Sequence, residues 1–107
     1  MAEAKIDYDY ENDILFLYKD GKVKDSMQMD DFVIDYSFDG NIVGIEIMDV
    51  SKMLRKLYKK RITKKLLKSI KNAEIRLRPG KEIVLIVILL KFANREQTEI
   101  PLMVPSL

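Results

Sequence analysis

The sequence predicts an α+β domain in which antiparallel β-hairpins are followed by a basic amphipathic helical segment and a second set of antiparallel strands. Three observations lead to this expectation. Apolar and polar residues alternate through the first half, residues 52–71 place their apolar residues at helical spacing, and alternation returns from residue 74. With 107 residues, we expect a single domain, 1–107, with one hydrophobic core.

Three strands are expected in the first thirty residues, at 5–10, 14–18 and 23–29. In the first of them apolar residues alternate with aspartates, which is the pattern of a strand with one face in water. The second is apolar on both faces. Turn signals follow both, at Glu11-Asn12 and at Asp20-Gly21.

The clearest predicted element is a hairpin of residues 32–38 and 41–47 around Asp39-Gly40. Asp-Gly between alternating strands favours a two-residue turn, because both turn residues then adopt a positive φ. Such a turn gives one wholly apolar face and pairs Tyr36 with Val43, Ile34 with Ile45, and Phe32 with Ile47. The hydrophobic pattern and the turn predict the same register.

Residues 52–71 contain ten basic residues and no acidic one. Their apolar residues lie at helical spacing, but the apolar stripe drifts near residues 60–63. This predicts either one kinked helix or two short helices. Ser51 is the expected N-cap of the first, and Thr63 would cap a second.

Strands are expected again at residues 74–78, 82–92 and 98–104. Residues 83–90 are eight apolar residues in succession, most of them β-branched or leucine, which is typical of a strand buried on both faces. Pro101 and Pro105 favour an edge position for the last strand, because proline donates no ladder hydrogen bond.

Two motifs in the first half carry a resemblance to a known family. Residues 8–17, YDYENDILFL, are similar to the pattern YD-x-E-x-D-x-L-Y-I. Residues 33–51 are similar to the pattern V-I-V-D-Y-D-x-x-G-x-V-V-G-I-E-I-L-x-A-S, from which Ser37 and Val50 depart. Together, over roughly residues 6–55, they resemble the bacterial and archaeal domain-of-unknown-function family 2283, with residues 60–107 as an extension outside it. The resemblance implies a small β-rich unit closed by a helix, and it implies no activity.

The residue types missing from the sequence exclude several kinds of site. Without Cys and His there is no disulfide, no thiolate or imidazole metal ligand and no Ser-His or Cys-His nucleophile pair. We therefore expect a protein that is not an enzyme and holds no cofactor. The longest apolar run is far shorter than the about 20 residues of a membrane-spanning helix, so we expect a cytoplasmic location. Charged residues make up 34% of the chain, a share typical of thermophile proteins.

Charge is distributed unevenly along the chain. Residues 1–50 hold 13 of the 17 acidic but only 4 of the 19 basic residues, a net charge of −9, and residues 51–107 carry +11. Either the two halves neutralise each other within one fold, which we favour, or they present opposite surfaces to a partner.

The candidate contacts for nucleic acid or a protein partner are the basic residues Lys52, Arg55, Lys56, Lys59, Lys60, Lys64, Lys65 and Lys68. The favoured alternative for these residues is the solvated face of an amphipathic helix. Only two of the ten basic residues in the segment are Arg, and Tyr58 is its single aromatic residue.

Acidic side chains are the remaining groups for acid–base or metal chemistry. Asp35 and Glu46 are expected diagonally on one face of the hairpin, and Asp9, Glu11 and Asp13 crowd one turn. Both sets offer oxygen ligands for Mg²⁺, so a Mg²⁺-dependent hydrolase is one hypothesis. The alternative, which we favour, is a solvated hairpin face and ordinary turn chemistry.

Residues 83–90 also predict self-association. A small sheet with one helical layer covers one face of this strand, and a second copy of the chain would cover the other. The candidate interface is Val84, Ile86 and Ile88. The leading hypothesis is therefore a homodimeric interaction module that binds a protein partner and no membrane. In the competing arrangement two sheets pack on each other in a closed monomer.

Overall fold

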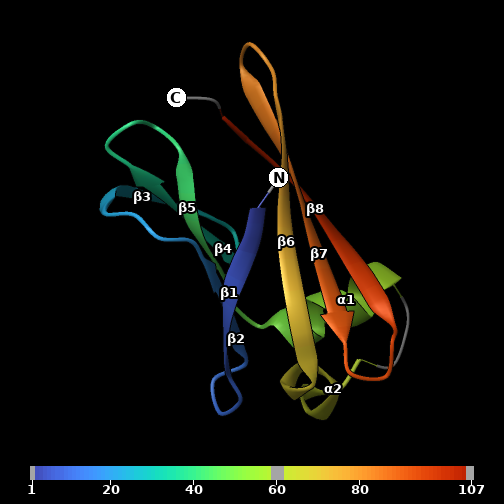
Figure 1. Ribbon diagram of the computed structural model, residues 1–107. Helices are drawn as coiled ribbons and strands as arrows, with labels where there is room; N and C mark the ends of the chain where they lie inside the picture. Colours follow the sequence, from blue (N-terminus) through green and yellow to red (C-terminus); the bar gives the residue numbers. More distant parts are fainter. Residues whose placement is uncertain (1, 59–61, 106–107) are drawn as a thin grey trace.

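The computed structural model describes residues 2–58 and 62–105, and in this part of the chain a curled sheet of eight antiparallel strands is accompanied by two short helices (Figure 1). The spatial order of the strands is β3-β4-β5-β2-β1-β6-β7-β8. The elements along the chain are β1 (Ala2–Asp9), β2 (Ile14–Tyr18), β3 (Val23–Met29), β4 (Phe32–Ser37), β5 (Ile42–Ile47), α1 (Val50–Tyr58), α2 (Lys64–Lys68), β6 (Ile70–Pro79), β7 (Ile83–Phe92) and β8 (Gln97–Pro105).

The predicted α+β class is wrong. Strands hold 60% of the structure and helices 14%, so the fold is mainly antiparallel β. The two expected sets of strands form one sheet, because β1 pairs with β2 on one side and with β6 on the other. The helical segment is also shorter than predicted: Ile70 already belongs to β6, where it pairs with Phe92 and packs against the core.

The hydrophobic core lies on the inner face of the curled sheet. Alternate residues of the strands point to this face and are shielded from solvent, which is what the period-two pattern predicts. Leu54 of α1, Leu67 of α2 and Ile62 pack on the same core, so the helices close one end of it. The strand residues with at most 1% exposure are Leu15, Leu17, Ile34, Ile45, Ile47, Ala73, Ile75, Ile86, Ile88, Leu90, Ile100 and Val104.

The hairpin of β4 and β5 confirms the predicted pairs Ile34–Ile45 and Phe32–Ile47. The turn differs from the expected one. The Gly40 amide donates to the Ser37 carbonyl and the Ser37 amide to the Asn41 carbonyl, which leaves a three-residue loop with Gly40 at φ 80°. This is a type I turn followed by a glycine bulge, the common alternative to a two-residue turn.

A second irregularity in the same hairpin corrects the third predicted pair. Tyr36 pairs with Ile42 instead of Val43, and Asp35 pairs with Gly44, so Val43 is a bulged residue. The carbonyl of Val43 accepts a hydrogen bond from the Lys19 amide, which lies just beyond β2. Ser37 faces Asn41 across the three-residue loop, whereas Asp35 pairs with Gly44, so the bulge at Val43 takes up the extra residue and restores the outer pairs.

Other local expectations have mixed outcomes. The bounds of β2 and β3 match the prediction, and β8 is at the edge of the sheet as Pro101 and Pro105 indicated. Thr63 is the N-cap of α2, and its side chain accepts a hydrogen bond from the Leu66 amide. Within the described residues, 2–58 and 62–105, no helix is long and apolar enough to cross a membrane. The cytoplasmic location stays a prediction.

Candidate functional site

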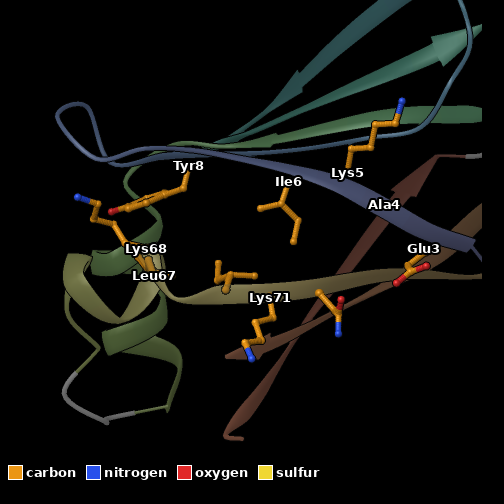
Figure 2. Close-up of a pocket in the computed structure, with 10 residues that line it drawn as sticks. Glu3, Ala4, Lys5, Ile6, Tyr8, Leu67, Lys68 and Lys71 are labelled. Carbon is orange, nitrogen blue, oxygen red and sulfur yellow. The ribbon is translucent and has the colours of Figure 1, made fainter. Parts of the chain in front are cut away.

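A groove opens in the sheet between β1 and β6. The two strands pair only where residues 2–4 of β1 meet residues 73–75 of β6. Beyond Ala4 they separate, and α2 lies at the wide end of the opening (Figure 2). The resulting cavity, here the β1–β6 groove, has a volume of about 770 Å³. Its lining residues are Glu3, Ala4, Lys5, Ile6, Tyr8, Leu67, Lys68, Ile70, Lys71 and Asn72.

At the wide end of the groove a hydrogen-bond network centres on Asp13, which is 7% exposed and adopts a φ of 56°. Its carboxylate accepts hydrogen bonds from the Tyr8 hydroxyl at 2.6 Å and from the Ser51 hydroxyl at 2.6 Å. The Ser51 amide donates to the same carboxylate at 3.1 Å, and the Val50 amide donates to the Asp13 carbonyl. The β1–β2 turn is thereby fixed to the start of α1.

This network corrects the predicted helix cap. Ser51 lies inside α1. Asp49, the residue just before the helix, has a φ of 51°, and its carbonyl accepts a hydrogen bond from the Met53 amide. The side-chain cap comes from Asp13, a residue 38 positions away. Burial, followed by the hydrogen bond to Asp13, raises the pKa of Tyr8 well above its usual range. The phenol therefore stays protonated and keeps donating.

The basic face of α2 rests on the same turn. The ammonium group of Lys68 lies 4.7 Å from the centre of the Tyr10 ring, and that of Lys64 lies 5.7 Å from it. These distances are those of cation–π contacts. Because residues four positions apart share a helix face, both lysines reach one ring. Two of the predicted contact residues are thus partly engaged within the chain.

The remaining basic candidates are solvent-exposed. Lys52, Arg55 and Lys56 lie on α1 and Lys65 on α2, and within the part of the chain that the structure describes no acidic side chain pairs with any of the four. Lys59 and Lys60 lie outside the described residues. Three of the four exposed candidates therefore lie together on α1, and the fourth lies on α2.

The acidic candidates take part in turns and strand pairing. Asp9 accepts hydrogen bonds from the side-chain amide and the backbone amide of Asn12, and these bonds lower the pKa of the Asp9 carboxyl. Asp35 accepts one from the Ser26 hydroxyl. Asp35 and Glu46 lie diagonally, as expected, because Asp35 pairs with Gly44 and Glu46 with Val33. Among the described residues no three acidic side chains are close enough to hold a metal ion.

Gly44 explains how Asp35 is accommodated. A Cβ atom at Gly44 would lie 2.7 Å from the Asp35 Oδ2 atom and 3.3 Å from the Asp35 Cβ atom. The glycine therefore leaves room for the aspartate on the neighbouring strand. This is the close packing across the hairpin that a glycine inside a strand indicates.

The predicted interface residues lie mainly inside the chain. Ile86 and Ile88 are 0% exposed, and Val84 packs against the core. The opposite face of β7 is the open one, with Ile83 at 52% and Met103 of β8 at 64% exposure. Leu89 also lies on this face but is buried; we call the other apolar residues of this face the outer stripe, and they are Ile83, Leu85, Val87, Pro101, Met103 and Pro105.

The sequence holds a signal that identifies the outer face. Lys91 lies on the same face of β7 as Leu85 and Val87, and Glu99 is paired with Leu89 on that face. A charged residue at the end of an apolar run marks the side that faces water. Counting back from Lys91 in steps of two therefore separates the outer stripe from the core residues.

Comparison with known proteins gives a family and two relatives. The family model described as protein of unknown function (DUF2283) matches residues 5–51. An uncharacterised protein of Methanocaldococcus jannaschii is 52% identical over 52 residues, which are 48% of this chain and 45% of that protein. A Methanosarcina mazei protein named "Putative hypoxanthine phosphoribosyltransferase" is 30% identical over 95 residues, 88% of this chain and 72% of that one.

The first of these relatives is matched over less than half of its own length. No solved structure matches the chain. The family resemblance that the two motifs carry is confirmed, over nearly the span predicted from them. Residues 5–51, a little less than half of the chain, are thus a match to the DUF2283 family of proteins of unknown function.

Proposed function

We propose that the protein is a non-enzymatic interaction module that self-associates into a homodimer through the outer stripe of β7 and β8. The observation that carries this proposal is the exposure of large apolar side chains on the outer face of one strand pair, with Ile83 at 52% and Met103 at 64%. Monomeric proteins rarely expose large contiguous apolar patches, and such patches often mark interaction surfaces.

The pairing of β7 with β8 makes the stripe continuous. Leu85 pairs with Met103 and Val87 with Pro101, so four apolar side chains occupy adjacent positions on one face. Complete burial of each large aliphatic side chain contributes about 1.5–3 kcal/mol, which favours covering the stripe. In a two-fold dimer, the commonest assembly, the outer stripe of one copy packs against the outer stripe of the other.

Light scattering coupled to size exclusion tests this proposal. The wild-type protein is expected near twice the chain mass of 12.5 kDa at micromolar concentration. Val87→Asp places a charge in the stripe and is expected to give a folded monomer. Val33→Asp is the matched control, because Val33 lies on the outer face of β4, away from the stripe, and this variant is expected to remain a dimer.

The inner face of the same strand serves as a second control. Ile86 is fully buried, so Ile86→Asp is expected to unfold the chain rather than to separate two copies. A wild-type mass near 12.5 kDa, or a Val87→Asp variant that keeps the dimer mass, would contradict the proposal.

Nonspecific binding of nucleic acid is a second candidate, favoured by the exposed cations of α1 and α2. Lys52, Arg55, Lys56 and Lys65 are exposed and unpaired among the described residues, so phosphates can reach them. Affinity would be micromolar or weaker at physiological salt and would fall steeply as salt rises. A fluorescence titration of duplex and single-stranded oligonucleotides at two salt concentrations tests this. Binding that ignores salt, or no binding at low salt, would exclude it.

The name of the Methanosarcina relative raises an enzymatic alternative, which we do not propose for this chain. Enzymes that hold phosphate groups often bind them at the N-terminus of a helix. Here the Asp13 carboxylate and carbonyl already accept from the Ser51 and Val50 amides at the start of α1. That helix end is therefore occupied by the chain's own acidic residue.

A further inference from the structure

We propose that the β1–β6 groove binds an extended peptide of a partner protein as an added β-strand, with an acidic end of the peptide against Lys68 and Lys71. This site lies between β1 and β6 and is separate from the outer stripe of β7 and β8. The inference therefore stands or falls independently of self-association.

The backbone of β1 supplies the first reason. β1 pairs with β2 at residues 5–9 and with β6 only at residues 2–4. Among the described residues, the side of β1 that faces β6 has no ladder partner beyond Ala4. At about 3.3 Å per residue, the open stretch is roughly 15 Å long. An open strand edge offers backbone donors and acceptors to an incoming extended chain.

β6 presents a shorter open stretch, residues 70–72. It begins at Ile70, but its pairing with β1 begins only at Ala73. An extended peptide between the two strands would meet an open edge on each side. Amide groups are needed to complete such a ladder, and a nucleic acid backbone has none, so the geometry favours a peptide over an oligonucleotide.

The side chains in the groove suit an alternating peptide. Ile6 of β1 and Leu67 of α2 (Figure 2), together with Ile70 of β6, give it an apolar floor. Ile6 and Ile70 are only half-buried. Alternate side chains of a bound strand point to the same face, so every second peptide residue would pack on this floor. The volume of about 770 Å³ is within the 300–1,000 Å³ range of ligand sites.

The charges at the two ends of the groove define a direction. Lys68, held over the Tyr10 ring, and the exposed Lys71 line the end near α2. Glu3 lines the narrow end, while the ammonium group of Lys5 is engaged with the Asp20 carboxylate at 2.8 Å. An acidic group is therefore attracted to the α2 end. The expected partner is an extended segment in which every second residue is apolar and one end is acidic.

Fluorescence anisotropy with synthetic peptides tests the inference. The probe is a labelled hexapeptide of alternating valine and threonine that ends in two glutamates. Two control peptides accompany it, one ending in two lysines and one with the probe's sequence but N-methylated at alternate backbone amides. We expect the probe to bind, the lysine peptide to bind at least tenfold more weakly, and the methylated peptide to lose binding because it cannot complete the ladder.

Variants of the protein locate the site. The double variant Lys68→Glu/Lys71→Glu is expected to weaken probe binding at least tenfold, whereas Lys52→Glu/Lys56→Glu, with the same charge change on α1, is expected to leave it unchanged. Thermal melts establish that both variants remain folded. Val87→Asp is expected to bind the probe as the wild type does, which separates this result from the outcome for self-association.

Three results would overturn the inference. They are an absence of probe binding by the wild-type protein, equal binding of the N-methylated peptide, and equal losses in the α1 and α2 variants. The last result would assign the effect to overall charge. In that case an oligonucleotide that competes for the same cations would identify nucleic acid as the ligand.

Discussion

The two hairpins β4–β5 and β7–β8 lie in opposite halves of the sheet; their inner faces share one core, and their outer faces differ. Ile34 and Ile45 of the first and Ile88 and Ile100 of the second are all buried in the same core. On the outside, β4–β5 carries Asp35 and Glu46, whereas β7–β8 carries the apolar outer stripe. The comparison shows that the inward-facing residues of a strand determine how it packs in the core. Its outward-facing residues determine whether an apolar surface is left exposed to solvent.

The largest effect on stability is expected when substitutions on the two faces of β7 are compared. Ile88→Ala removes methyl groups from a fully buried site and is expected to lower the free energy of unfolding by about 2–5 kcal/mol. Val87→Ala, on the outer face, is expected to cost less than about 1 kcal/mol at concentrations where the chain is monomeric. Urea denaturation measures both. Equal losses would mean that the two faces are equally buried within one chain.

The next effect concerns the network that closes the family-matching half. Asp13→Ala removes the acceptor for Tyr8 and for the Ser51 amide and hydroxyl, and we expect a loss of about 2–3 kcal/mol. Asp39→Ala, in the exposed β4–β5 loop, is the matched control. Thermal unfolding of the two variants measures the difference. If Asp13→Ala melts with the control, then α1 does not depend on this cap.

A smaller effect is expected at the β4–β5 turn. Gly40 adopts a φ of 80°, where a β-branched residue is strained, and no heavy atom lies within 4 Å of a Cβ placed there. Gly40→Val therefore tests backbone strain alone, at an expected cost of about 1–2 kcal/mol. Gly40→Asn, which tolerates this conformation better, should recover part of it. An unchanged midpoint for Gly40→Val would mean that the loop readily adopts another turn.

The smallest expected effect is a dependence on pH. Burial raises the pKa of Tyr8 above the unfolded value of about 10. Above that value the unfolded chain binds fewer protons than the folded one, so stability is complete below pH 10 and falls as pH rises further. Tyr8→Phe should flatten this decline, and denaturation midpoints between pH 9 and pH 11 measure it. A wild-type decline that the variant reproduces in full would assign it to other residues.

Much of the fold is readable from local patterns, because alternation and turn residues act over a few positions. β2, β3 and two of the three predicted pairs of β4–β5 match the prediction. The register prediction is wrong at Tyr36, because the loop has three residues instead of two and a bulge at Val43 then restores the outer pairs. The fold class is wrong because β1 joins the two expected sets of strands into one sheet. The helical segment ends earlier than predicted because Ile70 packs against the core as part of β6.

The candidate sites were harder to predict, because they depend on contacts between distant segments. The sequence predicts ordinary turn chemistry for Asp13, and neither motif indicates its hydrogen bond to Ser51, 38 positions away. The β1–β6 groove arises where two strands more than sixty positions apart in the sequence stop pairing, which no local pattern encodes. The outer stripe, in contrast, was within reach, since Lys91 marks its face.

The most direct test of the central claim, that the outer stripe is covered by a second copy, uses the absence of cysteine from the chain. Met103→Cys places one thiol in the stripe, and Phe38→Cys places one in the β4–β5 loop, at native exposures of 64% and 69%. Maleimide labelling rates are measured as protein concentration rises through the micromolar range. We predict that labelling at position 103 slows with concentration while labelling at position 38 does not; equal, concentration-independent rates at both positions would contradict the account.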